Sequence, residues 1–216
     1  MAKINENSLI SRVKVVHFLH ISTSEIEIKD LIKAWIAIST AFAIAFSGSM
    51  LSAGFYSKFI MASLTVGAGF LLHELGHKIV AQRYGCFAEF RSFDAMLLLA
   101  IAMSFLGFIF AAPGAVMISG RVSKERNGKI SAAGPIVNLV LASLFLALLF
   151  SPLPHYFKFL SYYGFLINSW LALFNMVPFW LFDGYKIFKW NKIMYFAIIG
   201  VAFSFMLLQH FIAVPK

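Results

Sequence analysis

Long apolar stretches separated by short polar connections dominate the pattern of this chain. Each stretch has about the 20 residues that an α-helix needs to cross the hydrocarbon core of a bilayer. A polar amino-terminal tail, residues 1–30, precedes them. The pattern predicts an all-α polytopic membrane protein with five to six transmembrane helices, in a single membrane-embedded domain over residues 31–216 with its core at about 59–190. The apolar segments are 33–51, 59–82, 95–112, 131–150, 159–177 and 192–212.

Composition and the placement of charge support this interpretation. Hydrophobic residues make up 61% of the 216 residues and charged residues 12%, about half the charged fraction of a soluble domain. The formal net charge of +9 is spread between the apolar segments and forms no basic stripe. It therefore indicates topology signals and contacts with anionic lipid, and not a nucleic-acid interface. The single cysteine, Cys86, excludes an intrachain disulfide.

The basic residues also predict which side of the membrane each connection faces. The tail through Lys33 holds five Lys/Arg and the first connection holds only Lys58, which places the amino terminus in the cytoplasm. Connections 78–91 and 121–129 hold three and four Lys/Arg. If both are cytoplasmic, segment 95–112 must enter the membrane and return on the same side. The alternative is six single spans with one basic loop outside, and the charge rule favours the re-entrant segment.

A His-Glu-x-x-His motif lies inside the second apolar segment. On a helix, His73 and His77 share one face, so both imidazoles can reach a single metal ion. Glu74 is close enough to act as the general base toward a water at that metal. Two neutral nitrogen ligands, an adjacent base and an open coordination position are what zinc-dependent hydrolysis requires. Because His77 precedes Arg83 by six residues, about 9 Å at helical rise, the site is expected about a third of the way into the cell membrane from the cytoplasmic face.

The periodicity changes around segment 95–112. Residues 87–93 and 115–119 are predicted to form short β-strands, and Pro113-Gly114 is a turn signal before the second of them. Non-helical backbone at membrane depth is tolerated where protein buries it or where it lines a water-filled cavity. We therefore expect these strands near the active site. Glu89 and Asp94 are predicted to be solvated or ion-paired residues and not metal ligands.

A second polar group interrupts the fifth apolar segment. Pro178 breaks the helix that contains Asn175, and Asp183-Gly184 follows near the basic end of this segment, at the depth of the two histidines. An isolated carboxylate there would be costly, whereas one bound to a metal would not. Asn138 places an amide inside the fourth apolar segment, where it needs a partner. Either an interhelical hydrogen bond or a role at the site would satisfy it.

Together these groups resemble the site-2 protease family of zinc intramembrane metalloproteases. The resemblance covers about 59–190 and rests on His73-Glu74-x-x-His77 and Asn175-x-x-Pro178-x-x-x-x-Asp183-Gly184, with Ala133-Gly134-Pro135-x-x-Asn138 between them. Many members of that family carry a PDZ domain between the motifs. Residues 85–130 are largely apolar and too short to hold one, so a short form without this domain is expected.

The resemblance implies a role for each residue of the two motifs. It implies that Glu74 is the catalytic base, and that Asn175 and Asn138 position the substrate backbone or stabilise the developing oxyanion. It also implies that the cofactor is Zn²⁺. The implied metal ligands are His73, His77 and Asp183.

The predicted function is that of a zinc-dependent intramembrane endopeptidase that cuts within or near the transmembrane segment of a membrane protein, as in regulated intramembrane proteolysis. A helix in the bilayer has its carbonyls hydrogen-bonded, so the substrate must unwind locally, and strand 87–93 or 115–119 could pair with it. Two alternatives are open. One is a different class of membrane metalloprotease, with Glu89 or Glu125 as third ligand. The other is a non-catalytic membrane scaffold or carrier for zinc, which would not need Glu74.

Overall fold

The computed structural model describes residues 15–18, 21–109 and 112–214. Residues 1–14 and 19–20 of the expected polar tail lie outside the described residues. The elements, in chain order, are β1 (Val15–Phe18), β2 (Ile21–Ser24), α2 (Glu25–Ser47), α3 (Phe55–Ala62), the π-helix η1 (Ser63–Gly67), α4 (Ala68–Arg83), β3 (Phe87–Ser92), α5 (Asp94–Ser104), β4 (Gly114–Ser119), α6 (Lys124–Phe150), α7 (His155–Asn175), α8 (Asp183–Trp190), α9 (Lys192–Leu208) and the 3-10 helix η2 (Gln209–Phe211).

Four helical stretches of the described chain are long and apolar enough to cross a membrane. The chain is thus mostly helical with several candidate spans, as the apolar pattern predicts, while the number of five to six spans stays a prediction. Helix α7 has sufficient length at 21 residues but carries Lys158 and Asn168, and it is not one of the four. The four candidate spans are Glu25–Ser47, Phe55–Arg83, Lys124–Phe150 and Lys192–Phe211.

The span that carries the His-Glu-x-x-His motif is a continuous helix built from α3, η1 and α4. At the π-turn the Ala68 amide donates to the carbonyl of Ser63, and the Trp35 indole Nε1 of α2 donates to the same carbonyl at 3.0 Å. A Cβ on Gly67 would lie 2.7 Å from Cδ1 of Trp35. Helix α2 therefore packs closely on the motif helix where the helical backbone widens.

Strands β3 and β4 form an antiparallel hairpin, which confirms the predicted strands. Ser92 lies opposite Gly114 in the register, so the segment between them leaves and returns at the same end of the hairpin. Helix α5, within that segment, has only 11 residues, about half the length of a span. This geometry favours a re-entrant segment over a single crossing by residues 95–112.

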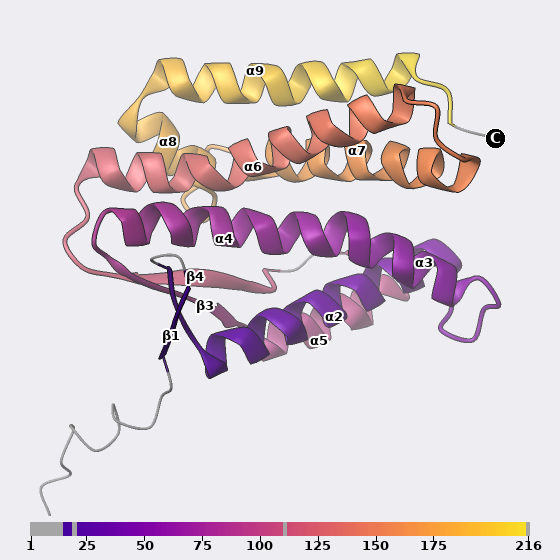
Figure 1. The fold of residues 1–216 in the computed structure, drawn as a ribbon, viewed down its shortest axis with the longest axis horizontal. Coiled ribbons are helices and arrows are strands. Elements are labelled where there is room, and N and C mark those ends of the chain that lie inside the picture. Colours follow the sequence, from indigo (N-terminus) through magenta and orange to yellow (C-terminus); the bar gives the residue numbers. More distant parts are fainter. Residues whose placement is uncertain (1–14, 19–20, 110–111, 215–216) are drawn as a thin grey trace, which may run out of the picture.

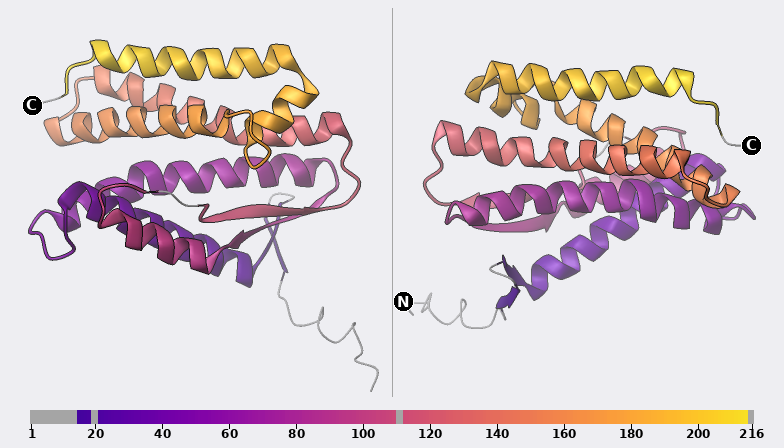
Figure 2. Two further views of the ribbon diagram at one scale, coloured as in Figure 1. Left: turned by 180° about the vertical axis from the view of Figure 1, so that it is seen from behind. Right: turned by 45° about the horizontal axis from the view of Figure 1, so that its top comes forward.

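Helix α4 lies in the middle of the molecule. Helices α6 and α7 lie on one side of it, with α9 beyond them, and the hairpin, α2 and α5 lie on the other side (Figures 1 and 2). Helices α4 and α6 approach closely, because a Cβ on Gly76 would be 3.3 Å from the Ala133 carbonyl oxygen. The motif helix therefore contacts both halves of the fold. On the hairpin side, one buried apolar cluster consists of Ala34, Ala37, Phe90 and Leu97.

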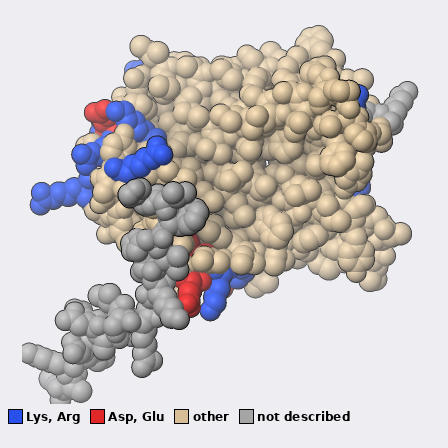
Figure 3. Space-filling model, viewed as in Figure 1, with Lys and Arg blue, Asp and Glu red and all other residues tan. Residues whose placement is uncertain are grey.

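Charged side chains gather at one end of the molecule. On the face shown in Figure 3 they lie mainly at the end where α6 and α9 begin and α4 ends, and the broad middle is formed by other residues. At the opposite end, Lys58 of α3 lies over the ring of Phe159 in α7. An apolar middle between polar ends is the surface that a bilayer requires.

Candidate metal centre

Two imidazoles from α4 form one side of the centre. His73 and His77 lie one helical turn apart, and their Nε2 atoms are 3.0 Å from each other. Both residues are buried, 5% and 8% exposed. The spacing in the sequence therefore brings both rings to one point, as the motif predicts.

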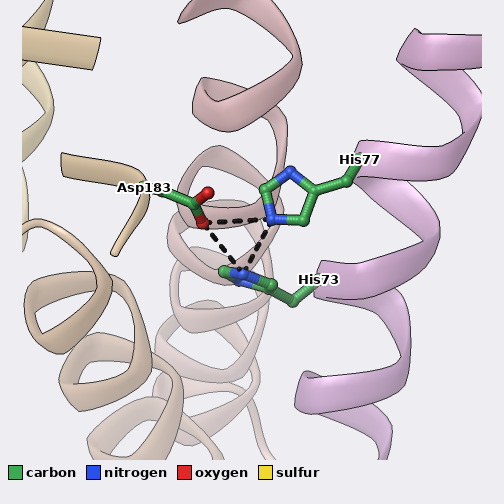
Figure 4. Close-up of side chains that lie close together, drawn as sticks. All are labelled: His73, His77 and Asp183. Atoms are coloured by element: carbon green, nitrogen blue, oxygen red, sulfur yellow. Dashed lines mark hydrogen bonds and ion pairs between the residues drawn. The ribbon is translucent and has the colours of Figure 1, made fainter. Parts of the chain in front are cut away.

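Asp183 completes the group from the first residue of α8. Its Oδ2 lies 3.3 Å from Nε2 of His73 and 3.1 Å from Nε2 of His77 (Figure 4). The chain reaches this point after α7 ends at Asn175, and the backbone of Gly184 then approaches Met176 so closely that a Cβ on the glycine would collide with the Met176 carbonyl. Glycine is needed there because the two stretches of backbone are in contact.

The donor set and the space between the donors fit a metal ion. One ligand atom from each of the three residues lies within 4.8 Å of the others. Two imidazole nitrogens and a carboxylate oxygen are a common set for a tetrahedral site with one open position. Gly134 of α6 borders this space, since a Cβ there would be 2.5 Å from Nε2 of both histidines. The glycine thus leaves room where any other side chain would meet the ligand atoms.

Partners outside the group orient both rings. His73 Nδ1 donates to Oδ1 of Asn138 at 2.6 Å, and His77 Nδ1 donates to the Ile130 carbonyl at 2.8 Å. With the proton on Nδ1, Nε2 carries the free lone pair, and both rings direct this atom toward Asp183. The rings are thus held in the tautomer that binds a metal.

Asn138 combines the two roles left open by the sequence. Its Nδ2 donates to the Gly69 carbonyl of α4 and to Oδ1 of Asn168 in α7, both at 3.1 Å. The amide is fully buried and therefore joins three helices while its oxygen holds His73. It acts on the centre through the histidine.

Glu74 is buried beside the centre and faces β4. Its Oε2 accepts a hydrogen bond from the Val116 amide at 3.2 Å, and the residue is 8% exposed. The strand predicted to lie near the site is therefore in direct contact with the candidate base.

Other candidate residues lie apart from this group. The side chain of Asn175 donates to the Leu171 carbonyl of its own helix at 2.9 Å, so in this structure its amide group is directed along α7. Glu89 is buried and paired with Arg91, and Asp94 pairs with Lys33. Within the described chain, the third member of the histidine group is Asp183, and neither Glu89 nor Glu125 belongs to it.

Several residues around the centre were not predicted from the sequence. The Ile130 carbonyl is a backbone group, so its residue type does not predict a contact with His77. Asn168, like Asn138, is an amide within an apolar segment and could have been found by that criterion. Lys78, counted from the sequence among the basic residues of the connection after the motif helix, instead lies within α4. It is 1% exposed and forms an ion pair with the fully buried Glu27 of α2.

The chain is similar to a known archaeal protein. The chain is 43% identical over 147 residues to the protein named "Putative zinc metalloprotease MJ0611" of Methanocaldococcus jannaschii, and the match covers 66% of this chain and 76% of that protein. No family model matches the chain, and no solved structure matches it.

Proposed function

The chain belongs to the zinc metalloprotease family of this archaeal protein, and from that premise we propose that it is a zinc-dependent intramembrane endopeptidase. It would hydrolyse a peptide bond within or near the transmembrane segment of a membrane protein, as a short site-2 protease without a PDZ domain. The observation that carries the proposal is the meeting of His73, His77 and Asp183 on a helix that is long and apolar enough to span a bilayer.

The three residues would hold the zinc ion, which the donor set and the space beside Gly134 fit. Zinc bound there would supply a Lewis acid that activates a water nucleophile and polarises the scissile carbonyl. Asn138 and the Ile130 carbonyl keep both histidines in the binding tautomer. The protein therefore prepares the ligands through bonds that exist before substrate arrives.

Glu74 would act as the general base and then as the general acid. Its carboxylate follows His73 directly in α4, and would take a proton from the attacking water and pass it to the leaving amine. The burial of this carboxylate, with one hydrogen bond to the backbone of β4, keeps it at the site and out of bulk water.

The outer edge of β4 is the place where an unwound substrate would pair. The outer edge of β3 is occupied, because the Phe90 amide donates to Glu27 and the Ala88 carbonyl accepts from Gln82. On β4, the outward Val116 amide meets Glu74. A substrate strand added to β4 would therefore lie next to the candidate base and satisfy its own freed backbone groups.

The oxyanion would need a further donor, and we assign this to Asn175. Its Nδ2 bonds within α7 in this structure, so it would have to rotate toward the substrate. A well-placed oxyanion donor contributes about 3–4 kcal/mol to catalysis.

The protein would lie in the cell membrane with the charged end of Figure 3 in the cytoplasm. Basic residues lie where α4 ends and α6 begins at that end, namely Arg83, Arg121, Lys124 and Arg126. The site would then open toward the cytoplasmic side, and its partners would be a transmembrane substrate and the surrounding lipid.

Two substitutions test whether Asp183 is a metal ligand and Glu74 is the general base. Asp183→Ala removes an anionic ligand, so zinc content and cleavage should fall together. Glu74→Gln leaves the three ligands intact, so zinc should stay near stoichiometric while cleavage of a membrane-spanning test substrate drops by about 10²–10⁴. Metal analysis and one cleavage assay on purified protein measure both. Full proteolysis by Glu74→Gln would refute the proposal, and a zinc scaffold or carrier predicts near-normal function after that change.

A further inference from the structure

A buried ion pair on the hairpin side of α4 has no part in the metal centre. Lys78 Nζ of α4 pairs with Glu27 Oε2 of α2, and the two residues are 1% and 0% exposed. Ionisable groups at membrane depth are costly, and a buried pair gives little net stability compared with apolar residues of the same volume. The pair therefore calls for a role other than holding α2 to α4.

The carboxylate of Glu27 connects three elements. Its Oε2 accepts from Lys78 and from Thr23 Oγ1 at 2.7 Å, and its Oε1 accepts from the Phe90 amide of β3 at 2.9 Å. The amide of Glu27 is itself fixed by the N-cap residue Ser24 at 3.2 Å. Glu27 thus projects from the capped first turn of α2 onto the backbone of the hairpin.

The hairpin register connects this contact to the catalytic base. Phe90 lies directly opposite Val116, and both amides point outward, which is the geometry of a non-hydrogen-bonded pair. One outward amide donates to Glu27 and the other to Glu74. The hairpin is therefore held between two carboxylates, one from α2 and one from α4, at a single residue pair.

We infer that Glu27 is a positioning residue whose bond to the Phe90 amide sets the hairpin against Glu74, with Lys78 as the counter-charge that lets this carboxylate be buried. This inference rests on the proposed function. Glu27 holds the Phe90 amide from the capped first turn of α2, and the cross-strand pair carries the constraint to Val116. The contact between Phe90 and Glu27 lies on the outer edge of β3. It therefore sets the distance between Glu74 and the edge of β4 that we assign to substrate pairing.

Two double substitutions test this, because neither leaves a lone buried charge. Glu27→Leu with Lys78→Met removes the ion pair and the acceptor for the Phe90 amide. Glu27→Gln with Lys78→Met removes the ion pair but keeps an amide oxygen facing Phe90. If the contact with Phe90 positions the hairpin, hydrogen exchange at Phe90 and Val116 should rise about fivefold in the Leu variant, as expected for one lost hydrogen bond, and stay near wild type in the Gln variant.

Cleavage should follow the same order. The Leu variant should lose roughly 10–100-fold in kcat, as expected for a misplaced substrate strand, while both variants bind zinc to the wild-type level. A purely structural ion pair predicts equal behaviour of the two variants, and that result would overturn the inference. Fivefold faster exchange at Phe90 and Val116 in the Gln variant would show that the Phe90 contact does not hold the hairpin without the ion pair, and it would also overturn the inference.

A matched control removes another ion pair of α2. Lys33 and Asp94 are 2.6 Å apart but largely exposed, so Lys33→Met with Asp94→Asn should leave exchange and cleavage within twofold of wild type. Failure of the proposed function has a different signature: wild-type protein would cut no membrane substrate, while the exchange difference between the two variants would remain.

Discussion

Gly134 shows how one missing side chain makes the centre accessible to a metal. It is buried in α6, and a Cβ at this position would be 2.5 Å from Nε2 of both His73 and His77. Real Cβ atoms do not approach other atoms that closely, so alanine must displace at least one ring. The requirement is steric, because the glycine lies within a regular helix where alanine is otherwise preferred.

We expect Gly134→Ala to lower zinc affinity more than it lowers the stability of the apo protein. The gain of about 1 kcal/mol in helix propensity offsets part of the cost of about 1–3 kcal/mol for displacing a ring, so the metal-free Tm should fall only slightly, while the increase in Tm on adding zinc should shrink. The matched control is Gly200→Ala in α9, where no atom lies within 4 Å of the added Cβ. Thermal unfolding with and without zinc measures both variants. An unchanged zinc-dependent increase in Gly134→Ala would contradict this account of the centre.

Asn138→Leu should weaken zinc binding by about 10–100-fold, the usual effect of losing the partner of a metal-ligating histidine. Leucine has the same branched arrangement of heavy side-chain atoms, although it is larger, and it removes the acceptor of His73 Nδ1. Asn138→Asp keeps an oxygen acceptor and should retain more affinity than the leucine variant. Competition with a chelator of known affinity gives both values. Equal zinc affinity in the leucine variant and wild type would show that His73 does not depend on this bond.

Residues with distinctive chemistry at fixed spacing were predictable, and their supporting contacts were not. The two histidines and Asp183 meet as expected, because a motif on one helix and a carboxylate after a helix break both leave signals in the sequence. The bond of His77 to the Ile130 carbonyl joins residues 53 positions apart, and the pair of Glu27 with Lys78 joins residues 51 positions apart. Such contacts depend on how helices pack and leave no periodic signal.

At the scale of elements, the hairpin brings the outer edge of β4 to the candidate base, which accepts from the Val116 amide. Val116→Pro removes the outward amide of β4 but keeps the strand, since proline is tolerated on an edge whose N–H faces away from the ladder. We expect cleavage of a membrane substrate to fall by at least about fivefold, because the amide can no longer bond to Glu74 or to a substrate strand and each such bond is worth about 1 kcal/mol, with zinc content unchanged. Val116→Ala keeps the amide and should remain near wild type. Wild-type cleavage by the proline variant would exclude pairing of the substrate at this amide.

Sequence periodicity was sufficient to predict some of the elements and not the boundaries of others. Alternation gave the two strands of the hairpin, and the segment between them proved to contain an 11-residue helix where the sequence offers an apolar run of span-like length. The start of α2 at Glu25 lies before the apolar run, because Ser24 caps the helix and acidic residues occupy its first turn. Hydrophobicity alone predicts the apolar part of a helix. It does not show that polar residues extend the helix beyond that part, as they do at the start of α2.

At the scale of the whole molecule, charge and the hairpin register point to the same topology. Basic residues flank the segment 93–113 on both sides, at Arg91 and at Arg121. The ends of that segment meet because Ser92 pairs with Gly114. A chain that starts and ends at one point of a hairpin cannot place its two flanks on opposite faces of a bilayer about 30 Å thick.

This topology predicts the outcome of single-cysteine labelling in a Cys86→Ser background. Phe87→Cys and Lys124→Cys lie on either side of the segment, and both positions are exposed. A membrane-impermeant thiol reagent should label both from the same side, in inside-out vesicles and not in right-side-out ones. Tyr56→Cys, 78% exposed near Lys58 at the other end of the motif span, should show the opposite preference and serves as the control. Labelling of the first two positions from opposite faces would mean that residues 93–113 cross the bilayer once, which would separate the hairpin strands and contradict the register on which the site depends.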